Sequence, residues 1–350
     1  MRCLGPALLA CLFSLPARAE VVVFPAPDGG ERELVVYSSL DSPLAQPLIE
    51  AFQAIRPDVA VRYEDLLTGE IADRVIKETD AGEATADLIF SSAMDVTVKL
   101  ANDGYAREAD VPEAAVWPGW AAWSNMVFAL TFEPAVIVYH KPSFPAGPPD
   151  TRAALIDWLA TAPEGSIGTY DIARSAVGYL FLMRDREHFA DLWPLIRAMG
   201  RAGVQVFPTS QDVIERVNSG VLKLGYNVLG SYAADQATKL PNLGLVLPRD
   251  YVVVVSRVAL VPKAARSPDL GEAFLAFLMS REGQTVLAER LRLPAVSLEV
   301  AGKDSAAAMQ EALGAKLRPV AVSPGLLAYL DAASRARVLA EWHAALEGGE

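Results

Sequence analysis

The stretch LVVYSSLDSPLAQPLIEAFQAIRPDVAVRYED, residues 34–65, decides the fold. It opens with an apolar run of strand length, Leu34 to Tyr37, and closes with a second such run, Val59 to Tyr63. Between them, from Pro43 to Ile55, apolar side chains recur at the spacing of an amphipathic helix. A strand, a helix and a strand in this order predict a parallel βαβ unit with a right-handed crossover.

The same alternation continues, with a helix expected from about Gly69 to Thr79, a strand from Asp87 to Phe90 and a helix from about Met94 to Asn102. Open α/β sheets bind ligands at the edge where the carboxyl ends of their parallel strands meet. The loops on this edge are rich in hydroxyls. Serine and threonine are also good helix N-caps, so a structural role is the alternative for each of them. The candidate ligand-binding residues here are Ser38, Ser39, Thr68, Ser91 and Ser92.

A second α/β unit follows, and strand-like residues 251–256 with a helix at 269–279 then return to the first. We therefore expect an α/β protein of two lobes with a ligand cleft between them. The chain should cross between the lobes near residues 127–131 and 245–251. The expected parts are 31–128 with 250–290 for the first lobe, 131–245 for the second, and 291–350 for a C-terminal helical segment that packs on the lobes.

Residues 1–19 have the form of a secretory signal peptide. Arg2 supplies a positive charge, an apolar run extends from Leu4 to Leu15, and Ala17 and Ala19 offer small side chains for cleavage. We expect a secreted, periplasmic protein that is cleaved near the end of this segment. A lipoprotein processed at Cys11 is the disfavoured alternative, because the apolar stretch before that residue is short.

Composition narrows the function. Both cysteines, Cys3 and Cys11, lie inside the signal, so the exported chain should carry no disulfide and no thiolate site. The formal net charge of −12 argues against nucleic acid and anionic membranes as partners. It does not exclude a small anionic ligand, which responds to the groups in its own pocket. The sequence contains no nucleophile elbow, zinc-protease motif, P-loop or dinucleotide fingerprint, so we expect no enzyme activity and no cofactor.

The chain resembles the type II periplasmic solute-binding proteins of ABC importers. The resemblance rests on the segments LVVYSSLDSPLAQPLIEAF, ADLIFSSAMD, TFEPAVIVYHK, GTYDIARSAVGYLF, LGYNVLGSYA and YVVVVSRVALVPKAARSPDLGEAFLAFLMSREGQ. It points to the branch that binds ferric ion, hexose phosphates, aminoethylphosphonate or phosphoglycerate, and within it to the phosphoglycerate-transport regulatory type of two-component operons. The resemblance implies a two-lobed fold that closes about hinge strands over its ligand.

The resemblance also implies the partners. A monomer that delivers its ligand to an ABC permease in the inner membrane is the expected role. A ligand-sensing subunit for a membrane receptor kinase is the alternative, because either partner would recognise the same closure of the lobes.

Ferric-ion members of this group carry two adjacent tyrosines after an asparagine. Here Asn227 is followed by Val228 and Leu229, and neither side chain offers the hard oxygen donor that ferric ion requires. We therefore expect no metal site and disfavour an iron-binding function.

In the family, the segment that corresponds to Arg174, Ser175 and Ala176 holds a phosphate or another anion. A helix N-terminus favours negative charge, and Arg174 could add a bidentate contact. The alternative is that Ser175 only caps its helix and Arg174 only lies on the surface. The remaining candidates, expected to line the ligand, are Thr169, Asp171, Tyr226, Asn227 and Tyr232. Asp171 would repel a phosphate unless it binds a ligand hydroxyl or Arg174.

Overall fold

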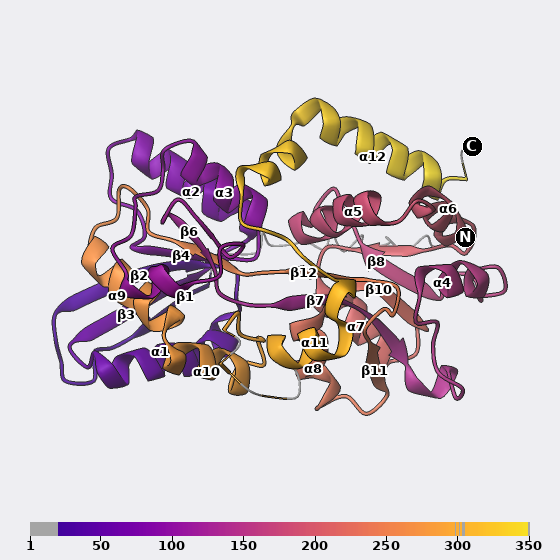
Figure 1. The fold of residues 1–350 in the computed structure, drawn as a ribbon, viewed down its shortest axis with the longest axis horizontal. Coiled ribbons are helices and arrows are strands. Elements are labelled where there is room, and N and C mark those ends of the chain that lie inside the picture. Colours follow the sequence, from indigo (N-terminus) through magenta and orange to yellow (C-terminus); the bar gives the residue numbers. More distant parts are fainter. Residues whose placement is uncertain (1–19, 298, 301, 303–304, 349–350) are drawn as a thin grey trace, which may run out of the picture.

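The structure is a computed structural model that describes residues 20–297, 299–300, 302 and 305–348. The expected signal peptide, with Cys3 and Cys11, lies outside the described residues. Two seven-stranded sheets, each flanked by helices, form two lobes (Figure 1). This confirms the two-lobed α/β fold that the sequence predicts.

The sheet of the first lobe is parallel at its centre. Strands β3, β2 and β4 run parallel, as the repeated strand and helix signals predict. Along β2, Leu34 and Val36 face one hydrophobic core and Tyr37 faces another. The strand order is β1 (Glu20–Phe24), β3 (Val59–Asp65), β2 (Arg32–Ser38), β4 (Leu88–Ser91), β13 (Val258–Leu260), β6 (Val127–Ala129) and β5 (Ala122–Trp123).

Helices cover both faces of this sheet, which is why its strands read as almost continuous apolar runs. On one face Phe52 and Phe274 pack edge to face, with their ring centroids 4.8 Å apart. The helices of that face are α1 (Ser42–Ile55), α9 (Pro268–Met279) and α10 (Arg281–Glu289). Those of the other are α2 (Thr68–Asp80) and α3 (Met94–Asn102). A 3₁₀ turn, η1 (Pro112–Val116), follows α3 along the chain.

The second lobe has the same layered plan. Its sheet runs β14 (Leu317–Pro319), β12 (Val252–Val255), β7 (Glu133–His140), β10 (Leu224–Leu229), β8 (Ile167–Tyr170) and β9 (Gln205–Phe207), and β11 (Leu243–Val246) also pairs with β7. One face carries α4 (Arg152–Leu159), α5 (Ala176–His188), α6 (Leu192–Arg201) and α12 (Ala332–Leu346). The other carries α7 (Ser210–Asn218), α8 (Gly230–Ala237) and α11 (Ala306–Leu313).

The chain crosses between the lobes twice where a strand of one sheet leads into a strand of the other, and again between α10 and α11 (Figure 1). The first crossing, residues 130–132, joins β6 to β7 and overlaps the expected region. The return crossing is at Ser256 and Arg257, between β12 and β13, and not at residues 245–251 as expected. The reason is that β12 is buried and pairs with both β7 and β14, so residues 252–255 stay in the second sheet.

The C-terminal segment, expected to be helical, contributes more than helices. Its strand β14 joins the second sheet. A 3₁₀ turn, η4 (Pro324–Leu330), packs on α3 of the first lobe, and α12 packs on α6 of the second. The segment therefore contacts both lobes, with α12 along the upper edge of the second lobe in Figure 1. In the part of the chain that the structure describes, no helix is both long and apolar enough to cross a bilayer.

Candidate ligand-binding site

The loops at the carboxyl ends of β2, β3 and β4 meet at one edge of the first sheet, as the sequence predicts. The hydroxyl oxygens of Ser39 and Ser92 lie 3.3 Å apart, and the amide of Ser92 donates to Oγ of Ser39 at 3.1 Å. The amide of Leu66, in the loop between β3 and α2, donates to the carbonyl of Ser38 at 2.8 Å. Thr68 is half-buried at the start of α2, beyond that loop.

Two of the predicted serines have structural roles instead. Ser38 is fully buried; its hydroxyl donates to the carbonyl of Phe90 at 2.8 Å and accepts from the amide of Leu40 at 3.1 Å. Ser91 is also buried, and its hydroxyl accepts from the amide of Ala93. Both hydroxyls close the turns after their strands and are not offered to a ligand. Ser39, Ser92 and Thr68 remain available on this edge.

In the second lobe, the candidate site is formed by the N-terminus of α5. Residues 171–176, here called the anion loop, lead from β8 into this helix. Ser175 is the N-cap: its hydroxyl accepts from the amide of Gly178 at 3.2 Å. Among the described residues, the amides of Ala176 and Val177 have no acceptor. Two free amides at a helix N-terminus are a natural receptor for an anion.

The remaining predicted residues of the anion loop play different parts. Asp171 organises the loop, because its carbonyl accepts from the amide of Ser175 at 2.8 Å and its carboxylate accepts from Ala173 at 3.0 Å. Arg174 is exposed, and its side chain makes no ion pair within the described residues. The structure therefore leaves the guanidinium of Arg174 free to pair with a ligand.

One glycine fixes α5 against the sheet. A Cβ added to Gly178 would come within 2.4 Å of Cβ of Tyr170 on β8. Only glycine permits this close approach of helix to strand. The position of the helix N-terminus thus follows from residue 178.

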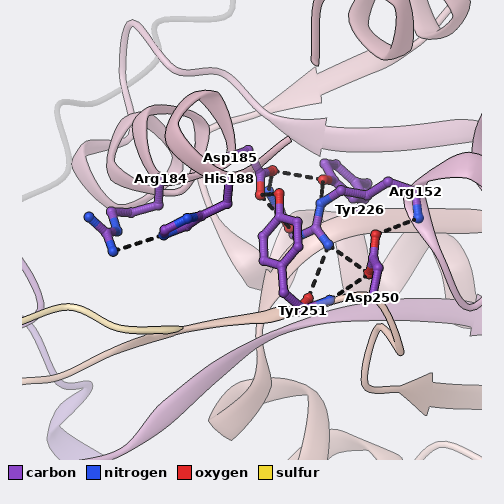
Figure 2. Close-up of polar contacts among 8 residues, drawn as sticks. Arg152, Arg184, Asp185, His188, Tyr226, Asp250 and Tyr251 are labelled. Atoms are coloured by element: carbon purple, nitrogen blue, oxygen red, sulfur yellow. Dashed lines mark hydrogen bonds and ion pairs between the residues drawn. The ribbon is translucent and has the colours of Figure 1, made fainter. Parts of the chain in front are cut away.

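A buried polar network holds the body of α5 in place (Figure 2). The guanidinium of Arg152 donates to Asp185 at 2.9 Å, to Tyr226 at 2.8 Å and to Asp250 at 2.9 Å. Asp185 also accepts from the hydroxyl of Tyr251 at 2.7 Å. Burial opposes the charge of Arg152, but Tyr226 and the carboxylates outweigh it, and the pKa of Arg152 is raised. The network joins α4, α5, β10 and the segment just before β12.

The network includes two residues that the sequence predicts in the site. Tyr226 and Asn227 were expected to line the ligand, but they are 3% and 5% exposed and both donate to Asp185, at 2.7 and 2.6 Å. Thr169 is equally buried and donates to the carbonyl of Tyr226 at 3.0 Å. All three side chains are buried in the lobe, and for Tyr226 and Asn227 the buried carboxylate of Asp185 is the partner that holds them there.

A second buried arginine lies at the return crossing. Arg257 is 1% exposed; it donates from Nη1 to the carbonyl of Ser39 at 3.2 Å, and its Nε lies 3.4 Å from Glu133. Glu133 accepts from the hydroxyls of Thr131, at 2.7 Å, and of Ser231. Burial opposes the charge of Arg257, but Glu133 outweighs it, so the pKa of Arg257 is raised. This cluster joins both crossing segments to the first-lobe edge.

Tyr232 links the two lobes directly. Its hydroxyl, on α8, donates to Asp41 at 3.4 Å, just before α1 of the first lobe. Burial raises the pKa of Tyr232 to about 12. Beside Asp41, burial and the negative charge of that residue raise the pKa of Asp65 to about 6. Tyr232 thus lies at the junction of the lobes, where the sequence predicted a ligand-facing residue.

The sequence interpretation missed Arg152, Asp185, Glu133 and Arg257. For Arg257 a signal existed, because it is the one charged residue between Tyr251 and Val261 in an otherwise apolar stretch. Asp185 stands among charged residues near the end of a helix, and no local pattern marks it as buried.

A cavity of about 400 Å³ lies between α8, α10 and α11, beside the first crossing. Its lining is mostly apolar, and it contains none of the predicted site residues. Among the described residues, no cluster of three or more histidine, cysteine, aspartate or glutamate side chains could hold a metal ion.

Residues 33–290 match the family of bacterial extracellular solute-binding proteins. The chain therefore belongs to this family, whose members serve ABC transporters as binding components and are not enzymes. It is 58% identical to the substrate-binding protein of an ABC transporter from Agrobacterium tumefaciens, over 95% of this chain and 100% of that one, with a TM-score of 0.90. No curated protein sequence matches the chain.

More distant structures share the fold. The periplasmic binding protein AfuA from Actinobacillus pleuropneumoniae, with fructose 6-phosphate bound, is 15% identical, with a TM-score of 0.74 over 91% of this chain and 99% of that one. Iron-bound HitA from Pseudomonas aeruginosa is 18% identical, with a TM-score of 0.68 over 88% of this chain and 99% of that one. At these identities the likeness concerns the fold alone.

Proposed function

We propose that this protein captures a small anionic organic solute that carries a phosphate group, and delivers it to an ABC permease from the periplasm. The observation that carries the proposal is the start of α5, where the amides of Ala176 and Val177 lack acceptors among the described residues and the exposed Arg174 lacks an ion-pair partner there. A phosphate has enough acceptor oxygens to engage both amides and the guanidinium together.

The first-lobe edge supplies the other half of the site. Ser39, Ser92 and Thr68 offer hydroxyls, which suit the hydroxyl groups of a sugar or a hydroxy acid. Asp41 and Asp65 stand on the same side and repel a second anionic group, so they favour a ligand with its charge at one end. The phosphate would then face α5 and the organic part would face the first lobe.

Closure of the lobes would complete the capture. The crossings at residues 130–132 and at Ser256 and Arg257 are short, and short crossings act as hinges in two-lobed binding proteins. Tyr232 and Asp41 already meet across the junction. A ligand that touches both lobes favours the closed state, which is the state that a permease would recognise.

An iron-binding function is the weaker candidate. Val228 is buried and Leu229 is 3% exposed, so neither presents an oxygen ligand. The buried Tyr226 is committed to Arg152 and Asp185. The exported chain would lack the phenolate pair that ferric ion favours.

The test is a thermal-shift screen of the purified protein against fructose 6-phosphate, 3-phosphoglycerate, 2-aminoethylphosphonate, unphosphorylated carboxylates and ferric citrate. A ligand at a hundred times its Kd stabilises a protein by about 2.7 kcal/mol. We expect stabilisation by a phosphorylated compound.

Calorimetry then compares the Arg174→Ala variant with Arg201→Ala, a matched control at an exposed position of α6. Loss of one charge-assisted contact should weaken binding of the active compound at least tenfold in Arg174→Ala and leave Arg201→Ala unchanged. Stabilisation by ferric citrate alone, or equal affinities of the two variants, would refute the proposal.

A further inference from the structure

The C-terminal helix reaches the anion loop. The guanidinium of Arg335, on α12, donates from Nη2 to the carbonyl of Ala173 at 3.3 Å. It also lies over the ring of Tyr179, with 4.9 Å between the guanidinium carbon and the ring centroid. Tyr179 is one turn inside α5 and is 1% exposed. One side chain of α12 therefore contacts the loop before α5 and the first turn of α5 itself.

These contacts come from a well-anchored helix. Val338 and Trp342 of α12 are 1% and 4% exposed and belong to the core that also contains Tyr179. The carboxylate of Asp331 caps α12 by accepting from the amide of Ser334 at 2.7 Å. Arg335 thus projects from a fixed point of the second lobe.

The contact has an electrostatic consequence for the anion loop. The carbonyl oxygen of Ala173, three residues before the free amide of Ala176, carries a partial negative charge that would repel an anion. The hydrogen bond from Arg335 partly neutralises this charge. The guanidinium adds positive charge beside the N-terminus of α5. Both effects favour an anion there.

We propose that Arg335 is a positioning residue for the anion site: it fixes the loop that presents the amides of Ala176 and Val177, without touching the ligand. This inference rests on the proposed function for its ligand, whereas the bracing of the loop does not depend on any ligand. The C-terminal segment also packs on α3 of the first lobe through η4. The anion loop is therefore connected to a segment that contacts both lobes.

The first experiment is hydrogen–deuterium exchange of the ligand-free protein over residues 172–178. The Arg335→Ala variant should exchange these amides at least fivefold faster than the wild type. The control is Arg337→Ala, on the same helix, because Arg337 is exposed and its side chain makes no hydrogen bond or ion pair within the described residues. The variant Arg335→Lys keeps the positive charge but loses the planar guanidinium group. Its exchange rates should lie between those of Arg335→Ala and Arg337→Ala.

The second experiment measures Kd for fructose 6-phosphate and for inorganic phosphate. We expect Arg335→Ala to weaken binding of either probe about tenfold and Arg335→Lys to restore part of that loss, with thermal unfolding recorded for each variant. Exchange equal to that of Arg337→Ala would overturn the bracing role, and faster exchange with unchanged affinity would overturn its link to the ligand. If the wild type binds neither probe, the proposed phosphate function fails, and exchange still decides whether Arg335 braces the loop.

Discussion

The two buried arginines stand in contrasting surroundings. Arg152 uses Nε, Nη1 and Nη2 in hydrogen bonds to Tyr226, Asp250 and Asp185, all inside the second lobe (Figure 2). Arg257 lies between the lobes, and its Nε has no well-formed hydrogen bond within the described residues. A fully paired arginine stabilises one arrangement of its neighbours. A partly paired one at a crossing can exchange partners when the lobes rotate.

The largest effect should follow from Arg152→Ala. Removal of Arg152 leaves the buried carboxylate of Asp185 without its cationic partner, and loss of one partner from a buried ion pair costs about 3–5 kcal/mol. Urea unfolding measures this loss. The control Arg249→Ala breaks an exposed pair with Asp150 and should change the free energy of unfolding by less than about 1 kcal/mol. Similar urea midpoints for the two variants would show that the buried network of Arg152 stabilises the fold no more than an exposed ion pair does.

Compared with Arg152→Ala, the variant Arg257→Ala should lose less stability but change the arrangement of the two lobes more. Within the described residues, the side chain of Arg257 makes one hydrogen bond, to the carbonyl of Ser39, and a long 3.4 Å contact with Glu133, so its removal loses less pairing than that of Arg152 and we expect a cost of about 1.5–3 kcal/mol. Small-angle scattering should show a larger radius of gyration, because the tie from Ser39 to the crossing is lost. Arg266→Ala, at an exposed position after β13, is the control. An unchanged radius would argue against a hinge role.

The smallest effect concerns pH at Asp65, near Arg257. Its pKa is raised to about 6 in the folded protein, so the folded state holds the proton to higher pH than the unfolded chain does. Stability should therefore fall as pH rises from about 4 to about 6. Because Asp65 is partly exposed, we expect the free energy of unfolding to fall by only about 1–2 kcal/mol over this range.

Urea unfolding at pH 4.5 and pH 7.5 tests this, since Asp65→Asn should remove that part of the difference. Asp58→Asn is the control, because Arg56 holds the pKa of Asp58 below its usual range, so this carboxyl should contribute little to the difference between the two pH values. An equal pH dependence in wild type and Asp65→Asn would contradict the prediction.

The local geometry of the candidate site was predictable where it depends on strand ends and helix starts. Ser39 and Ser92 meet because parallel strands bring their carboxyl ends together, and Ser175 caps α5 because serine accepts from a helix amide. Ser38, Ser91, Thr169, Tyr226 and Asn227 have the same residue types, yet they turn inward. The residue type determines which hydrogen bonds a side chain can make. It does not determine which partner lies within reach, because that depends on the tertiary structure.

By itself the sequence determined the alternation of strands and helices and the two lobes, because these follow from periodicities and turns among near neighbours, whereas the family and the anion loop followed from its resemblance to known binding proteins. Only the tertiary structure decided the return crossing, the partners of the two buried arginines and the reach of Arg335 to Ala173. Those contacts join residues far apart in the chain, such as Arg152 and Tyr226, which are separated by 74 positions, and Arg335 and Ala173, which are separated by 162. Burial makes such contacts strong, and burial is a property of the assembled layers.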